Sequence, residues 1–214
     1  MRRAGRPRGG RGSNQYRRKG VSQQGGDEGA VTDSARRSSL RAQAAEAPVA
    51  HESGSHVVGA GQLHVCGEAR GQGSGEAAVV GWGQSHVFVS GHATGTVTDG
   101  AVGSARDKAT LHVGGRAHGL AGDEATLTVA DQATGTASGR ASVTATGNAR
   151  VVLRDRASGV IADEAQADIT DDVELVALGH TRVRASGRSL VRAEPSVDVE
   201  LRDSARREHL PAVA

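Results

Sequence analysis

Nine histidines are the side chains in this sequence best suited to hold a metal ion. A zinc site needs three or four such ligands converging on one point. The histidines of the central region are instead spread over outward positions without common spacing, at His86, His92, His112, His118 and His180. We therefore interpret them as surface residues and predict neither a metal site nor a cofactor.

The sequence also shows no set of residues suited to nucleophilic catalysis. Cys66 is the single cysteine, so an intramolecular disulfide is excluded. Nothing around it in the sequence would activate the thiol, and no group of nucleophile, base and orienting residue is recognisable. We predict that the protein is not an enzyme, and we name no catalytic residue.

Basic residues are concentrated at the N-terminus. Residues 1–20 contain eight positive charges and no acid, whereas from residue 46 onward 21 acidic residues outnumber 15 basic ones. Such an arm could bind nucleic acid or another polyanion through phosphate contacts, or it could be a solubilising tail. The candidate polyanion-binding residues are Arg2, Arg3, Arg6, Arg8, Arg11, Arg17, Arg18 and Lys19.

Threonine pairs with one intervening residue suggest a different surface chemistry. In a strand, this spacing projects both hydroxyls to the same side, as an ice-binding face would require. The pairs are Thr94 with Thr96, Thr126 with Thr128, and Thr134 with Thr136. Whether they form an array depends on how the strands that carry them stack.

Those strands belong to a repeat. Residues 67–194 form sixteen consecutive octads without an insertion; position one is Gly nine times and Asp seven times, and position three is Ala in twelve. Positions five and seven are mostly small or aliphatic, while even positions are mostly polar. Strict alternation predicts strands with one buried face. Gly or Asp at position one predicts a left-handed turn residue, and the Asp side chain predicts a corner hydrogen bond rather than a calcium ligand.

A constant eight-residue spacing predicts a parallel β-solenoid, an all-β fold in which each octad is one side of a coil. Helices would not place glycine and alanine in this pattern, and sandwiches vary their strand and loop lengths. The recurring Gly/Asp, Ala and Val positions resemble the short-repeat, octapeptide β-solenoid proteins as a class. That resemblance implies a fold and no activity.

The number of octads in one coil is two or three, and the counts favour three. Gly and non-Gly residues at position five match in 8 of 13 pairs at a spacing of three octads and in 7 of 14 at two. A narrow interior of Ala and Gly favours two. With three, Thr110, Thr134 and Ser158 align but their partners do not, which argues against an ice-binding face. The same stacking predicts a mildly apolar stripe of Val80, Ser104, Thr128, Val152 and Val176.

The flanks divide the chain into four parts. We predict a disordered basic tail over 1–50, an N-terminal cap over 51–66, the solenoid over 67–194, and a C-terminal cap and tail over 195–214. Aromatic residues are only 1% of the chain, so the core must be built from small side chains. No apolar run is long enough for a signal sequence or a membrane span, which predicts a cytoplasmic protein without membrane contact.

Three bulky residues break the polar outward pattern near the first coils: Val80, Trp82 and Phe88. The segment around residues 50–66 could cover them, or they could form an exposed patch for a protein partner or a second copy. The function that fits best is a non-enzymatic structural or protein-interaction scaffold that self-associates. The alternative is polyanion or nucleic-acid binding through the N-terminal arm.

Overall fold

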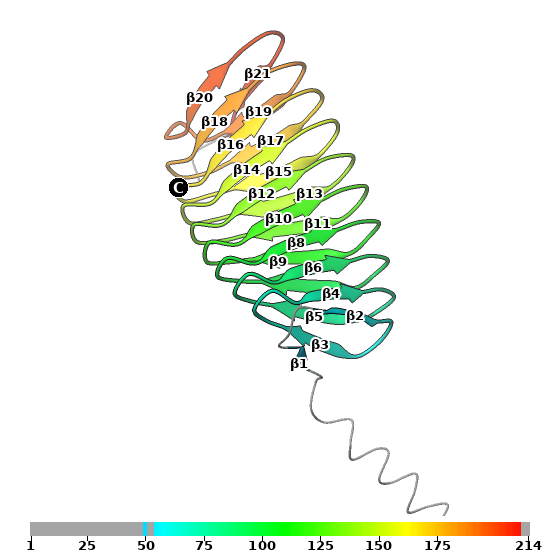
Figure 1. Ribbon diagram of the computed structural model, residues 1–214. Helices are drawn as coiled ribbons and strands as arrows, with labels where there is room; N and C mark the ends of the chain where they lie inside the picture. Colours follow the sequence, from blue (N-terminus) through cyan, green and yellow to red (C-terminus); the bar gives the residue numbers. More distant parts are fainter. Residues whose placement is uncertain (1–48, 51–53, 211–214) are drawn as a thin grey trace, which may run out of the picture. The chain divides into compact units, whose positions relative to one another are not determined.

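The computed structural model describes residues 49–50 and 54–210, which form a stack of short strands joined by tight turns (Figure 1). No helix occurs within these residues, and all neighbouring strands pair in parallel. This arrangement confirms the predicted parallel β-solenoid. The disordered tail predicted for residues 1–50 lies outside the described part, apart from a two-residue strand at its end.

Two sheets stand back to back, and successive strands alternate between them. We call the sheet of odd-numbered strands sheet A and the sheet of even-numbered strands sheet B. Sheet A contains β1 (Val49–Ala50), β3 (Gln62–Val65), β5 (Ala78–Gly81), β7 (Thr94–Val97), β9 (Thr110–Val113), β11 (Thr126–Val129), β13 (Ser142–Ala145), β15 (Ser158–Ile161), β17 (Glu174–Ala177), β19 (Leu190–Ala193) and β21 (Arg206–His209). Sheet B contains β2 (Ser55–Val58), β4 (Arg70–Gly73), β6 (His86–Val89), β8 (Val102–Ala105), β10 (His118–Ala121), β12 (Thr134–Ala137), β14 (Arg150–Leu153), β16 (Gln166–Ile169), β18 (Arg182–Ala185) and β20 (Asp198–Leu201).

Each coil contains two octads. Thr94 pairs with Thr110 and Thr110 with Thr126, which are steps of sixteen residues. Only the first coil differs, because Ser55 pairs with Arg70, fifteen residues later. The preference for three octads per coil is therefore wrong, and with it the apolar stripe that three-octad stacking predicted.

The packing of the core explains why the sequence count pointed to three. Leu111 of β9 lies beside Gly95 of β7, its neighbour in sheet A. A Cβ atom built on Gly95 would be 2.9 Å from Leu111 Cδ1, and one built on Gly103 of the facing sheet would be 2.8 Å from it. Leu111 thus fills space left by Gly95 beside it and Gly103 opposite it, whereas its other neighbour, Leu127, is also large. The size of the residue at position five therefore varies along the sheet without a fixed alternation.

The corners form as the octads predict. All sixteen position-one residues between 67 and 187 have positive φ, including seven aspartates such as Asp131 (φ 61°). The N–H of position three donates to the carbonyl of the preceding position eight, as from Ala117 to Gly114 (3.1 Å). The Asp131 carboxylate accepts from the N–H of Gly115, one coil earlier (2.9 Å). The corner aspartate therefore links coils, and the backbone ladder continues through the corner.

Position three lines the core next to the corners, and its alanines are fully buried. Three polar residues, Ser85, Thr181 and Ser189, also occupy position three. The Ser189 hydroxyl donates to the Ser186 carbonyl (2.9 Å), whereas the Oγ atoms of Ser85 and Thr181 are buried without a hydrogen-bond partner. These two hydroxyls are both in octads of sheet B.

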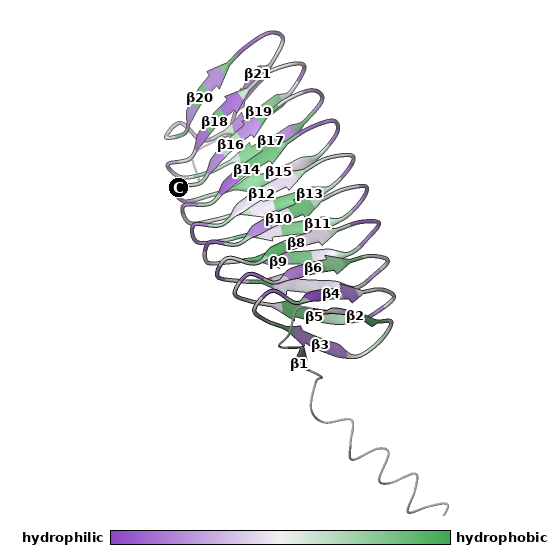
Figure 2. Ribbon diagram, in the orientation of Figure 1, coloured by the Kyte–Doolittle hydropathy of each residue, from purple (hydrophilic) through white to green (hydrophobic). Residues whose placement is uncertain are grey.

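The final coil ends the apolar core. Arg207 and His209 of β21 occupy the positions that in earlier coils point inward, and Arg207 Nη2 donates to the Glu194 carbonyl (2.9 Å). Polar side chains at these positions, among them the charged Arg207, disfavour the addition of another strand. Figure 2 shows the hydrophilic colour of β18 and β20 at this end of the solenoid.

Candidate interaction surfaces

The three bulky residues singled out from the sequence do not share a face. Val80 is on the outer side of sheet A, Phe88 is on the outer side of sheet B, and Trp82 lies at the corner between them. All three side chains are partly buried. Their role as an interaction site stays a prediction, but a single patch containing all three is not present.

Each aromatic ring has a neighbour of its own. The Trp82 ring meets the His64 ring edge to face, with centroids 5.9 Å apart, so β3 contributes to its cover. The Arg106 guanidinium lies 6.0 Å from the centroid of Phe88, in cation–π range. Phe88 is therefore the aromatic residue that belongs to a sheet surface.

The histidines are spread over both sheets and the corners. His86 and His118 share a column on sheet B, but Val102 lies between them. His118 Nδ1 is hydrogen-bonded to Thr134 Oγ1 (2.6 Å). Among the described residues no group of three His, Cys, Asp or Glu side chains could hold a metal ion. Cys66 is buried.

The eight basic residues predicted to bind a polyanion, from Arg2 to Lys19, lie outside the described residues. Polyanion binding through this arm stays a prediction.

The two-octad coil brings the hydroxyls of sheet A into register, contrary to the expectation from three-octad stacking. Thr94, Thr110, Thr126, Ser142 and Ser158 are successive partners at position four. Beside them at position six run Thr96, His112, Thr128, Thr144 and Val160. We call the eight hydroxyl residues of these two columns the hydroxyl face; they are Thr94, Thr96, Thr110, Thr126, Thr128, Ser142, Thr144 and Ser158.

Sheet B presents a different surface over the same coils. The outward residues of β6, β8, β10 and β12 contain no Asp, Glu, Lys or Arg and include the chain's only phenylalanine. We call these residues the sheet B patch: His86, Phe88, Val102, Ser104, His118, Leu120, Thr134 and Thr136. Leu120 is 40% exposed, and sequence reasoning missed it because a single outward leucine has no distinguishing pattern. Arg70 and Arg150 border the patch on either side along the sheet.

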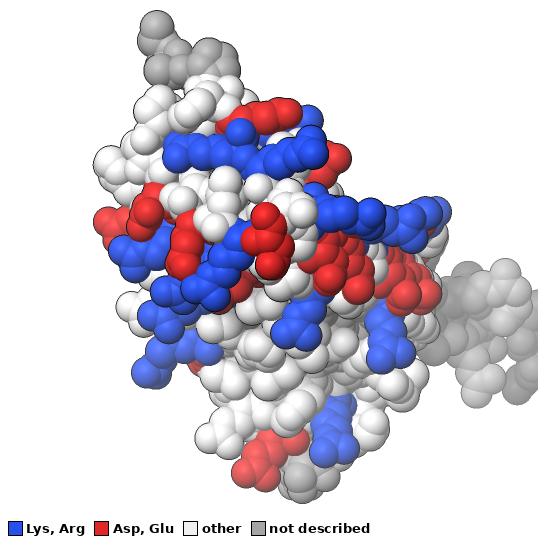
Figure 3. All heavy atoms as spheres, turned by 90° about the horizontal axis from the view of Figure 1, so that it is seen from above, with Lys and Arg blue, Asp and Glu red and all other residues white. Residues whose placement is uncertain are grey.

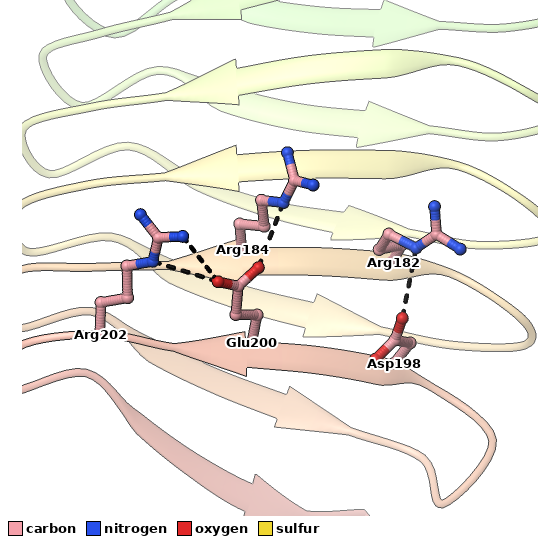
Figure 4. Close-up of polar contacts among 5 residues, drawn as sticks. All are labelled: Arg182, Arg184, Asp198, Glu200 and Arg202. Atoms are coloured by element: carbon pink, nitrogen blue, oxygen red, sulfur yellow. Dashed lines mark hydrogen bonds and ion pairs between the residues drawn. The ribbon is translucent and has the colours of Figure 1, made fainter.

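Charged side chains are frequent at the outward positions of the strands after β15 in both sheets. Seen from above, basic and acidic side chains are intermixed on the surface (Figure 3). On sheet B, Arg182 Nε is 3.2 Å from Asp198 Oδ2, and Arg184 Nε is 3.3 Å from Glu200 Oε2 (Figure 4). Arg202 Nη2 donates to Glu200 Oε1 (2.7 Å). The hydrogen bond and charge of Arg202, and then the charge of Arg184, hold the pKa of Glu200 below its usual value.

Comparison with known protein families, with curated proteins and with solved structures gives no significant match for this chain. No helix long and apolar enough to cross a membrane occurs in the part of the chain that the structure describes.

Proposed function

We propose that the protein is a non-enzymatic structural scaffold, a rigid β-solenoid that self-associates face to face through the sheet B patch. The observation that carries this proposal is an alternation of size along position six. Phe88, Ser104, Leu120 and Thr136 follow one another in register, so each large side chain is followed by a small one.

This alternation is self-complementary. A two-fold axis passing between β8 and β10 would place Phe88 of one copy over Thr136 of the other, and Leu120 over Ser104. Symmetric dimers use the same surface on both subunits, so such a match is what a two-fold interface needs. Apolar side chains that pack against small ones also give the dense interface centre found in stable contacts.

The charged residues that border the sheet B patch limit the size of the proposed contact. Arg70 and Arg150 would face each other across this axis, and their like charges would be tolerated only at a solvated rim. The contact is therefore limited to the four strands β6 to β12. Because this area is small, we expect association that depends on protein concentration.

Light scattering after size exclusion, on the full chain over a range of concentrations, tests the proposal. The double variant Phe88→Ser, Leu120→Ser is expected to stay monomeric where the native chain associates. The matched control is Val80→Ser, Val160→Ser on sheet A, since Val160 is 39% exposed against 40% for Leu120. A native chain that is monomeric throughout, or a control that dissociates equally, contradicts the proposal.

Polyanion binding by the N-terminal arm is the alternative function, supported by eight positive charges without an acid in residues 1–20. Binding of this kind should weaken steeply with salt. Removal of residues 1–20 is expected to abolish it and to leave self-association intact. Equal binding by the shortened chain would exclude the arm.

A further inference from the structure

The outer side of sheet A from β3 to β15 carries no Asp, Glu, Lys or Arg at positions four and six. Seven successive strands span roughly 29 Å at the usual spacing between strands. On sheet B a stretch without these residue types covers only the four strands between Arg70 and Arg150. Among the described residues, sheet A thus has the longer surface free of Asp, Glu, Lys and Arg, and the hydroxyl face occupies its centre.

The hydroxyl face is also regular. The strands β7 to β15 pair without a bulge, each residue opposite the one sixteen positions later. Threonine is β-branched and stiff at χ1, so equivalent threonines in neighbouring coils present their methyl and hydroxyl groups in similar directions. No hydrogen bond to another side chain is made by the hydroxyl face within the described residues, whereas Thr134 on sheet B is bonded to His118. The hydroxyls are therefore available to water.

The hydroxyls repeat in two directions, from coil to coil and along each strand. Neighbouring coils are about 4.8 Å apart, and residues two positions apart along a strand are about 6.6 Å apart. These two repeats are close to the two lattice repeats of water oxygens on a prism face of hexagonal ice. We propose that the hydroxyl face binds the surface of ice.

The chemistry of the face suits this ligand. Each hydroxyl can donate and accept a hydrogen bond, as a water molecule in the lattice does. The rigid backbone has already ordered the hydroxyls, so many weak contacts can form together without a further loss of conformational freedom. A charged side chain would keep its own hydration shell and disrupt the match, and the hydroxyl face has none. This inference concerns sheet A and is independent of self-association through sheet B.

The test uses ice itself as the probe. The purified full chain is expected to lower the growth temperature of a seeded ice crystal below its melting temperature and to give the crystal flat facets. Thr126→Tyr with Thr128→Tyr, in β11, is expected to reduce the gap between the melting and growth temperatures to the value seen in buffer alone. The matched control is Gln166→Tyr with Asp168→Tyr in β16, which faces the opposite side outside the sheet B patch and is expected to retain the gap. Circular dichroism establishes that each variant is folded.

A second variant keeps the test decisive by improving the face instead of damaging it. His112→Thr with Val160→Thr would complete the position-six column, and a larger gap between growth and melting temperatures is expected. A folded native chain that neither shapes ice nor opens such a gap overturns the proposal. So does a β11 variant that leaves ice activity intact, or one that changes only the oligomeric state, since the face would then be a contact between copies.

Discussion

Sheet A and sheet B have the same repeat, the same register and the same corners, but their side chains differ on both surfaces. Inside, sheet A contributes large residues at position five, such as Leu111 and Leu127, where sheet B contributes Gly103, Gly119 and Gly135. Outside, sheet A presents regular hydroxyls and sheet B presents apolar residues followed by charges. Identical backbone geometry therefore leaves the choice of side chain free to give each face its own chemistry.

In the central coils, where Gly103, Gly119 and Gly135 of sheet B face the interior, the core therefore depends most on Leu111 and Leu127 of sheet A. Leu111→Ala is expected to lower the free energy of unfolding by about 2–5 kcal/mol, because Leu111 is fully buried and its loss leaves a cavity. Leu120→Ala is the matched control on the outside of sheet B and should have a small effect. Urea denaturation followed by circular dichroism measures both. Equal losses for the two variants would contradict the burial of Leu111 in the core.

Gly103 allows a second test of the same packing. Gly103→Ala alone should destabilise the protein, since the added Cβ would lie 2.8 Å from Leu111 Cδ1. Combined with Leu111→Ala, the same change should cost less, because the space is then available. A double-mutant cycle measures this coupling, and strictly additive effects would contradict direct contact between the two sites.

The two sheets also differ in how they accommodate polar residues at position three. Ser85→Ala, on sheet B, is expected to stabilise the protein by about 1 kcal/mol, because it removes a buried hydroxyl that has no partner. Ser189→Ala, on sheet A, should destabilise it by a similar amount, because that hydroxyl donates to the Ser186 carbonyl. Thermal unfolding of the pair should give melting temperatures that move in opposite directions. Shifts of the same sign would show that Ser85 is solvated in solution.

These local features divide into those that the sequence could predict and those that it could not. Strand phase and turn geometry were predictable because position one must adopt positive φ, which only a few residue types tolerate. Gly115 and Asp131 both adopt positive φ there, at 64° and 61°. Coil size was not predictable from position five, because Leu111 and Gly95 are neighbours that compensate for each other in volume.

The number of octads per coil determines which outward residues align on each surface. With three octads per coil, Thr110 aligns with Thr134, and no continuous column of hydroxyls forms. The two residues lie on opposite sheets, and Thr110 instead pairs with Thr94 and Thr126. The signal was present in the sequence as Ser or Thr at intervals of sixteen from residue 94 to 158. The position of Phe88 opposite Val80 follows from the same two-octad spacing.

The corners leading into the two sheets offer a smaller test. Asp131→Gly keeps positive φ without strain but removes the carboxylate that accepts from Gly115 N, so a loss of about 0.5–1.5 kcal/mol is expected. Asp123→Gly makes the same change at a corner of sheet A, where the described residues show no side-chain hydrogen bond to the preceding coil. It controls for the added freedom of glycine in the unfolded chain. Chemical denaturation should give the larger loss for Asp131→Gly, and equal losses would assign no stability to the link between coils.

The smallest expected effect concerns the charged end of sheet B. Arg202→Gln should raise the pKa of Glu200 toward its ordinary value of about 4.5, because the main hydrogen bond and charge that lower this pKa are lost. A lowered pKa in the folded state means that the Arg202–Glu200 contact stabilises the protein above the ordinary pKa, and that this contribution disappears as the pH falls through the lowered value. Carboxyl-detected NMR titration measures the shift.

The control variant is Arg192→Gln on sheet A, where Arg192 is paired with Glu208 (3.1 Å). This substitution should leave the titration of Glu200 unchanged. Because both partners of the sheet B contact are exposed, we expect Arg202→Gln to change this titration while changing stability very little. An unchanged Glu200 midpoint in Arg202→Gln would show that the contact does not persist in solution.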